Sequence, residues 1–130
     1  MRALPNGIVT HLFSDIEGST RLARSLGDQV WADCLDLHRE FLSRAFLAHR
    51  GVVVDLEGDG LFVVFQDPVD AINGAISGQL ALADQVWPES CPLVVRMGIH
   101  TGEAVLRGEH YMGHEVHRAS RICSSAHGGQ

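Results

Sequence analysis

Apolar and polar residues follow one another in blocks, and each block has the length of one secondary-structure element. The apolar run GIVTHLFSD (7–15) begins at a glycine and ends in a polar turn, which predicts a strand. Ser19 and Asp28 are possible N-caps of the helices that follow. From residue 28 to about residue 50 the apolar positions have the spacing of one helical face, and Gly51 is predicted to end this helix. These positions are Trp31, Leu35, Phe41, Leu42, Ala45 and Phe46.

The middle of the chain predicts a hairpin followed by another helix. VVVDLEGDGLFVVF (52–65) consists of two β-rich runs around the turn at 57–60. Asp67 is a plausible N-cap, and Pro68 stands at the first helical position. Gly74 and Gly78 weaken this helix by roughly 1 kcal/mol each relative to Ala, so packing must hold it. Its apolar stripe is formed by Val69, Ile72, Ile76, Leu80 and Ala83.

The last third predicts two more strands and a final helix. Residues 93–102 and 103–108 have strand patterns, and residues 113–129 have a helical pattern that ends at Gly128 and Gly129. The order is therefore strand, helix, hairpin, helix, hairpin, helix. This order predicts an α+β fold, with an antiparallel or mixed sheet and helices on one face. No linker divides the chain, so residues 1–130 are expected to form a single domain.

Composition narrows the possible functions. The 130 residues carry a formal net charge of −6, which argues against broad electrostatic binding to nucleic acid or to an anionic membrane. An anionic ligand would need a bound cation or a local group of donors. No window reaches the ~20 apolar residues of a membrane span, and the N-terminus has no signal-peptide pattern. The 3 cysteines are widely spaced without a CxxC motif, so we expect no disulfide framework and a cytoplasmic location.

Two acids occupy positions at which carboxylates bind metals. Asp15 ends the first strand, and Asp59 lies in a glycine-flanked turn that other groups can approach closely. Mg²⁺ typically takes one or two carboxylates together with substrate phosphates. The turn at 18–20 is able to direct successive N–H groups toward a phosphate. The simpler alternatives are a turn residue for Asp59 and a helix cap for Asp15.

Histidines and arginines near the C-terminus leave several interpretations open. His110, His114 and His117 lie close together in sequence, which fits either a zinc site or solvated side chains. His11 and His100 lie on predicted strands and are expected to be structural. Arg118 and Arg121 either pair with surface acids or bind a phosphate. Arg121 is expected near the apolar side of its helix, beside Ala119, Ile122 and Ala126.

Four segments in order resemble the catalytic domain of class III nucleotide cyclases, the adenylyl and guanylyl cyclase family. They are LFSDIEGSTRL, EGDGLFVVF, VRMGIHTGEAV and YMGHEVHRASRICSSAHGGQ, and the resemblance runs from about Ile8 to Gln130. It implies a ferredoxin-like fold of the βαββαβ type. It also implies conversion of ATP, or possibly GTP, to the 3′,5′-cyclic nucleotide and pyrophosphate, for cyclic-nucleotide signalling. Two Mg²⁺ or Mn²⁺ ions would assist this reaction.

The resemblance also assigns expected roles to residues. Asp15 and Asp59 would hold the two metal ions, with the backbone carbonyl of Ile16 as a further ligand. Arg121 would stabilise the charge on the α-phosphate in the transition state. Because sites in this family form between two head-to-tail protomers, a homodimer would supply the metals from one chain and Arg121 from the other. The expected phosphate-binding residues are Glu17, Gly18, Ser19 and Thr20.

Three departures from the family pattern qualify these expectations. His117 stands where the family has the Asn that positions the ribose. The purine-reading positions, commonly Lys and Asp in adenylyl cyclases, are Asp55 and His110 here. Family domains continue through further strands beyond HGGQ, so we expect a domain that is incomplete at its C-terminus. The alternative to an active cyclase is a degenerate regulatory domain that binds nucleotide or a partner without turnover.

Overall fold

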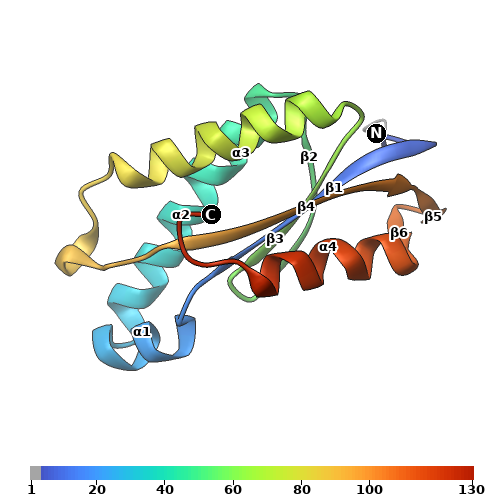
Figure 1. Ribbon diagram of the computed structural model, residues 1–130. Helices are drawn as coiled ribbons and strands as arrows, with labels where there is room; N and C mark the ends of the chain where they lie inside the picture. The colour runs from blue at the N-terminus through green and yellow to red at the C-terminus, as the bar shows by residue number, and fades with distance from the viewer. Residues whose placement is uncertain (1–3) are drawn as a thin grey trace.

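A four-stranded sheet forms the centre of the structure, a computed structural model that describes residues 4–130 apart from the side chain of Glu57 (Figure 1). Its strands are β1 (Ile8–Ile16), β2 (Val52–Glu57), β3 (Gly60–Phe65) and β4 (Val95–Glu103), in the order β2-β3-β1-β4. All three strand pairs are antiparallel. This confirms the predicted α+β, ferredoxin-like βαββαβ arrangement and excludes the mixed sheet.

Helices cover both faces of the sheet, so the expectation of helices on one face was wrong. α2 (Asp28–Ala48) and α3 (Pro68–Ala83) pack on one face, and α4 (His114–Ser125) packs on the other (Figure 1). The reason is that the strands are apolar on both sides. One face buries Leu12, Val63 and Phe65 in the larger core, and the other buries Val9, Phe62 and Val64 beside Tyr111.

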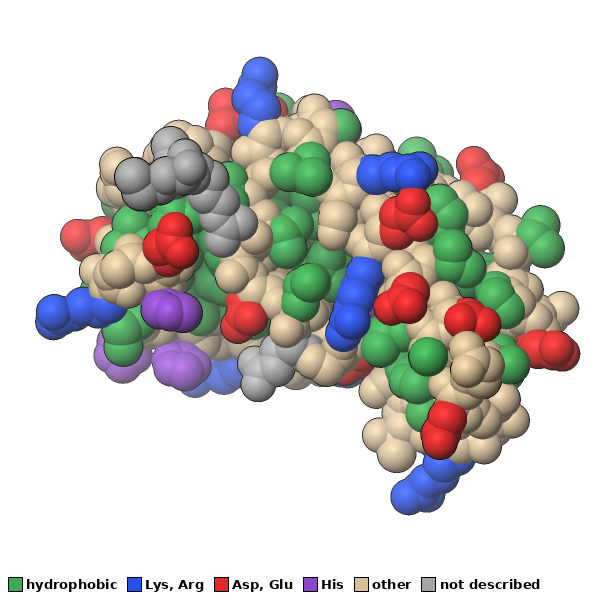
Figure 2. Space-filling view, turned by 180° about the vertical axis from the view of Figure 1, so that it is seen from behind, with side chains coloured by type: hydrophobic (Ala, Val, Ile, Leu, Met, Phe, Trp, Pro, Cys, Tyr) green, Lys and Arg blue, Asp and Glu red, His purple; other side chains and the backbone are tan. Residues whose placement is uncertain are grey.

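The short helix α1 (Ser19–Leu26) connects β1 to α2 and projects from the rest of the domain (Figures 1 and 2). Ser19 and Asp28 do not act as N-caps of α1 and α2. Each is the first helical residue, and Gly18 and Gly27 occupy the cap positions without a side-chain hydrogen bond. At α3 the prediction is confirmed, because Asp67 Oδ1 accepts a 2.8 Å hydrogen bond from the N–H of Val69.

The second hairpin is shifted along the chain from its predicted place. β4 continues to Glu103, and β5 (Val105–Arg107) pairs with β6 (His110–Met112) in a separate two-stranded sheet. The final helix ends at Ser125 instead of continuing to residue 129. The chain then follows the outer edge of β4, where the N–H of Gly129 donates to the carbonyl of Val95 at 2.8 Å.

The apolar stripe of α3 faces outward. Val69, Ile72, Ile76 and Leu80 are between 51% and 62% exposed, whereas the buried positions are Ala71, Gly74, Gly78 and Leu82. These mostly small residues let α2 approach closely. A Cβ atom on Gly78 would lie 2.9 Å from Leu42 Cδ2. Close helix packing therefore compensates for the low intrinsic helix propensity of the two glycines.

A similarly close contact fixes α4 on the sheet. A Cβ atom on Gly98 of β4 would lie 2.2 Å from the backbone nitrogen of Cys123. Cys123 is buried, and burial raises the pKa of its thiol to about 11. The three cysteines are free and buried, as the absence of a disulfide framework predicts. Within residues 4–130, no helix has the length and apolar composition needed to cross a membrane.

Candidate functional site: two carboxylates at the end of β1

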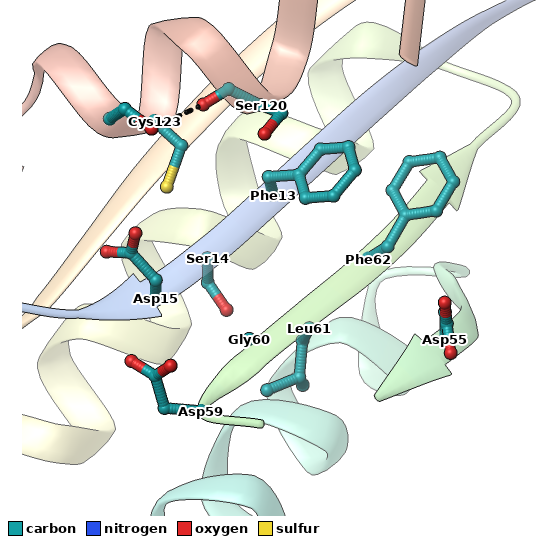
Figure 3. A pocket seen from close by; sticks show the side chains of 11 residues that line it. Phe13, Ser14, Asp15, Asp55, Asp59, Gly60, Leu61, Phe62, Ser120 and Cys123 are labelled. Atoms are coloured by element: carbon teal, nitrogen blue, oxygen red, sulfur yellow. Dashed lines mark hydrogen bonds between the residues drawn. The ribbon is translucent and has the colours of Figure 1, made fainter. Parts of the chain in front are cut away.

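The sheet brings Asp15 and Asp59 together. Asp15 lies near the end of β1, and Asp59 lies in the turn that precedes β3, the antiparallel neighbour of β1. The end of one strand therefore meets the beginning of the other. Both acids line two adjacent cavities of about 210 and 530 Å³. In Figure 3 the two side chains occupy the same end of the smaller cavity.

Ile16 links the two acidic positions. Its backbone N–H donates a 2.8 Å hydrogen bond to Oδ2 of Asp59. Its side chain is 2% exposed and belongs to the larger core. The Asp59 carboxylate is thus tied to a residue that the core holds in place, next to Asp15.

Arg96 binds both oxygens of Asp15. Arg96 faces Asp15 across the β1–β4 ladder, and its Nε and Nη2 each donate to the carboxylate at 2.6 Å. Both side chains are about one quarter exposed, and the hydrogen bonds to Asp15 raise the pKa of Arg96. Nη1 also donates to the carbonyl of Ser124 at 3.2 Å, so Arg96 connects Asp15 to α4.

Three of the four expected phosphate-binding residues line the larger cavity. Gly18, Ser19 and Thr20 form its wall together with two arginines of α1, Arg21 and Arg24. Glu17 is not among the residues that line it. Its Oε2 instead accepts a 2.8 Å hydrogen bond from the N–H of Gly128, beyond the end of α4.

The two expected base-reading residues lie in different surroundings. Asp55 is exposed on β2 and lines the smaller cavity at the end away from Asp15 (Figure 3). Phe13 and Phe62 also line it, and their rings stack with centroids 4.4 Å apart. His110 is exposed on β6 and is not among the lining residues of either cavity.

His117 and Arg121 also lie outside both cavities. Both side chains are exposed on α4, which packs on the sheet through Ala119 and Cys123. The expectation that Arg121 lies near the apolar side was therefore wrong. The part of α4 that does line the smaller cavity consists of Ser120, Cys123 and Ser124. Histidine side chains gather at the end of the molecule opposite α1 (Figure 2).

Three buried or partly buried ionisable residues form a cluster under α4. His11 on β1 is fully buried, and its Nδ1 lies 3.4 Å from the carbonyl oxygen of His100. His100 Nε2 donates to Oε2 of Glu115 at 2.6 Å. Burial lowers the pKa of His11, and the hydrogen bond from His100 lowers the pKa of Glu115.

The donor set fits a hard divalent cation more than zinc. Asp15, Asp59 and the Ile16 carbonyl offer only oxygen ligands, and Mg²⁺ needs one or two such carboxylates when a substrate supplies phosphate oxygens. A cation bound at Asp15 would share this carboxylate with Arg96. In the described part of the chain, residues 4–130, no group of three or more His, Cys, Asp and Glu side chains is arranged to hold a metal. The zinc interpretation of the C-terminal histidines therefore has no support.

Comparison with known proteins decides the family. The sequence model of the adenylate and guanylate cyclase catalytic domain matches residues 1–130. This chain belongs to that family. The adenylate cyclase of Lachancea kluyveri is 31% identical over 153 residues, which cover 98% of this chain and 8% of the yeast protein. An uncharacterised protein of Mycobacterium tuberculosis is 34% identical, over 99% of this chain and 43% of its own length. The cyclase domain described here thus spans less than half of these curated relatives.

Solved structures show the same fold. Adenylate cyclases from Trypanosoma brucei in their monomeric state superpose with a TM-score of 0.89 at 25% identity, over 99% of this chain and 74% of theirs. The monomeric guanylyl cyclase domain of a fusion protein from Blastocladiella emersonii gives 0.86 at 20% identity, over 99% and 81%. The second comparison shows the cyclase fold alone.

Sequence reasoning did not identify Arg96 or the α4 residues of the smaller cavity. An arginine inside the apolar run VRMGIH was a visible signal. Its partner could not be read from the sequence, because the register between β1 and β4 depends on pairing across about 80 intervening residues.

Proposed function

We propose that this chain acts as a purine nucleotide cyclase, forming the 3′,5′-cyclic nucleotide and pyrophosphate from ATP, with GTP as the other possible substrate. The proposal follows from family membership and depends above all on one observation. Asp15 and Asp59, from two different strand ends, line the same pair of cavities and are linked through Ile16.

The proposed metal ligands are Asp15, Asp59 and the carbonyl oxygen of Ile16. Two Mg²⁺ or Mn²⁺ ions bound there would lower the pKa of the attacking ribose 3′-hydroxyl and offset the charge on the departing pyrophosphate. The hydrogen bond from Ile16 to Asp59 keeps one carboxylate oriented before any ligand arrives. Gly18, Ser19 and Thr20 would bind the β- and γ-phosphates in the larger cavity. Glu17 is engaged elsewhere in this structure, because its carboxylate accepts from the N–H of Gly128 and its own N–H donates to the carbonyl of Val94 at 3.0 Å.

The remaining catalytic groups are proposed to come from a second chain. His110, His117 and Arg121 are all exposed and lie outside the cavities that contain Asp15 and Asp59. A head-to-tail homodimer would place the α4 surface of one chain over the cavities of the other. Arg121 would then stabilise the charge that develops on the α-phosphate, and His117 would hydrogen-bond the ribose.

Purine recognition is assigned to Asp55 and His110 in the same dimer. Asp55 only accepts hydrogen bonds when ionised, so it would accept from the adenine amine, or from N1–H and the amine of guanine. His110 donates or accepts according to its tautomer.

A second candidate function is supported by the Asp15–Arg96 pair. Arg96 occupies both oxygens of a proposed metal ligand at 2.6 Å, and His117 replaces the family's ribose-binding Asn. A regulatory domain that binds nucleotide or a partner without turnover would tolerate both features.

A cyclase assay distinguishes the two functions. The purified chain is incubated with ATP or GTP and Mn²⁺, and cyclic nucleotide and pyrophosphate are quantified. Turnover that is lost in Asp59→Asn supports the cyclase. Mn²⁺-dependent nucleotide binding without either product supports the regulatory domain. The absence of both binding and turnover contradicts the cyclase and a nucleotide-binding regulatory domain, and leaves only a domain that binds a protein partner.

A further inference from the structure

The turn that carries Asp59 is short and lies at the end of the β2–β3 hairpin. Only Gly58 and Asp59 separate the two strands, and Gly58 has a positive φ of 57°. Asp59 is tied to β1 by the bond between its Oδ2 and the N–H of Ile16. This bond fixes the carboxylate only if the backbone of the turn is itself held in place. The side of the turn away from β1 faces α2.

Arg39 of α2 holds the first residue of this turn. Its Nη2 donates a hydrogen bond to the carbonyl oxygen of Gly58. The Arg39 side chain is half-buried, and among residues 4–130 its Nε has no hydrogen-bond partner. The guanidinium of Arg39 therefore binds the turn, and none of the carboxylates that the structure describes, a set without Glu57, forms an ion pair with it.

His38, the preceding residue of α2, is a fully buried histidine. Its Nδ1 donates a 2.7 Å hydrogen bond to the carbonyl of Leu35. Burial lowers the pKa of His38, and the nearby charge and backbone of Asp59 act in the opposite direction. Nε2 is buried and, within residues 4–130, lacks a partner that meets hydrogen-bond geometry.

We infer that His38 and Arg39 are positioning residues for the proposed metal site. They hold the Gly58–Asp59 turn from the α2 side, so that the carboxylate of Asp59 reaches the N–H of Ile16 and stays beside Asp15. This inference rests on the proposed cyclase function for its metal, but the geometry it describes exists without one. Neither residue touches the substrate in this assignment.

The first test measures that geometry in the metal-free chain. Arg39→Met keeps the aliphatic stem and removes the donor to Gly58. We expect hydrogen exchange of the Ile16 amide to accelerate by about tenfold, as for a local opening, while the Leu12 amide in the middle of β1 changes less than about twofold. Arg44→Met is the matched control, because Arg44 is exposed on the same helix and, among the described side chains, forms an ion pair with Glu40 alone. Unchanged Ile16 exchange in Arg39→Met overturns the inference.

The second test measures metal affinity. Mn²⁺ is titrated by calorimetry in the presence of 2′,3′-dideoxy-ATP, which lacks the attacking hydroxyl. We expect Arg39→Met to weaken Mn²⁺ binding by about five- to tenfold, within the usual net contribution of one hydrogen bond, with Arg44→Met unchanged. A wild-type chain that binds no Mn²⁺ overturns the proposed function and this inference with it. A third outcome separates the two: the wild-type chain binds Mn²⁺, Asp59→Asn abolishes this binding, and Arg39→Met leaves it unchanged. That result overturns the inference about His38 and Arg39 but not the proposed function.

His38 is tested by a conservative and a non-polar substitution. His38→Gln retains a donor and an acceptor, whereas His38→Leu keeps bulk and removes both. We expect Mn²⁺ affinity to follow the order wild type, Gln, Leu. Leu42→Ala is the control for general destabilisation. Leu42 is fully buried one turn further along α2, and its Cδ2 lies next to Gly78 of α3 and not next to the Asp59 turn. If Leu42→Ala weakens Mn²⁺ binding as much as His38→Leu at equal loss of stability, His38 is a structural core residue and the inference is wrong for it.

Discussion

Ile16 and Asp59 are 43 positions apart in the sequence, yet the N–H of one donates a 2.8 Å hydrogen bond to the carboxylate of the other. Both residues are proposed metal ligands, Ile16 through its carbonyl oxygen and Asp59 through its side chain. The bond requires the end of β1 and the turn before β3 to lie side by side, which the antiparallel β1–β3 pairing provides. The strand pairing therefore brings two of the three proposed ligands, the Ile16 carbonyl and the Asp59 carboxylate, close together.

Neutral substitutions of the two acids should remove cation-dependent nucleotide binding and leave the fold intact. Asn at position 59 still offers an oxygen to the Ile16 N–H, so the loss is confined to the negative charge that a cation needs. We expect Asp15→Asn and Asp59→Asn to abolish Mn²⁺-dependent binding of a nucleotide analogue in calorimetry. Asp36→Asn, an exposed acid on α2, is the control. Wild-type affinity in both site variants would contradict the metal assignment.

Activity should require two chains. Arg121 is exposed on α4, outside the cavities that Asp15 and Asp59 line. Asp15→Asn and Arg121→Ala should each be inactive as homodimers, and mixing them should restore one working site in each heterodimer. Cyclic nucleotide formation against mixing ratio measures this. A mixture that stays inactive after exchange of subunits has been demonstrated would disprove the shared site.

Selection between ATP and GTP should be weak. Asp55 is exposed and His110 lies on an exposed strand, so neither presents a buried, fixed donor that the wrong base would leave unpaired. Strong discrimination, about 10⁴-fold or more, depends on such buried groups. We expect a preference of less than roughly 100-fold, or about 3 kcal/mol. Competition between the two nucleotides in the presence of Mn²⁺ measures it, and a preference above about 1,000-fold would show that the two residues form a specific reader.

The domain should lose stability as the pH falls below about 6.5, the ordinary histidine value. Burial lowers the pKa of both His11 and His38, so the folded chain keeps them neutral while the unfolded chain takes up protons. The contribution of these two histidines to the free energy of unfolding is complete above about pH 6.5. It is lost as the pH falls toward the pKa values that they have in the folded chain. Urea unfolding from pH 7.5 to 5 measures the slope. His11→Asn should reduce it, and His114→Gln, at an exposed position, should leave it unchanged.

Gly98 should tolerate substitution far less than the exposed apolar residues of α3. A Cβ at Gly98 would lie 2.2 Å from the backbone of Cys123, so Gly98→Ala must displace α4. We expect it to reduce the free energy of unfolding by at least about 2 kcal/mol. Ile76→Ala should cost less than about 1 kcal/mol, since Ile76 is 54% exposed. Chemical denaturation of both variants provides the comparison, and equal losses would refute this account of α4 packing.

Local chemistry in the sequence was sufficient for several elements. The cap at Asp67, the proline after it and the glycine-flanked turn at Asp59 act over a few residues, and the structure has each where it was predicted. The alternation of apolar runs also sufficed for the α+β class, because strands and helices must bury their apolar sides together. The second hairpin was misplaced because strand pairing, and not local pattern, determines where β4 ends.

Orientation of side chains was decided only by the tertiary structure. The sequence shows a stripe of large apolar residues on α3, but the helix packs through Ala71, Gly74 and Gly78, because small residues allow closer approach to α2. Arg121 was expected beside apolar neighbours, but the close contact of α4 at Gly98 turns Ala119 and Cys123 to the sheet and leaves Arg121 exposed.

For the candidate site, too, sequence and tertiary structure determined different things. The sequence by itself supplied the candidate residues, because Asp15, Asp59 and the 17–20 turn stand in segments that resemble those of the cyclase family. The tertiary structure alone determined their partners, namely Arg96 on Asp15, Ile16 on Asp59, and α2 behind the Asp59 turn. The physical reason is that these contacts depend on the register of antiparallel strands and on helix packing, which join residues 19 to 81 positions apart.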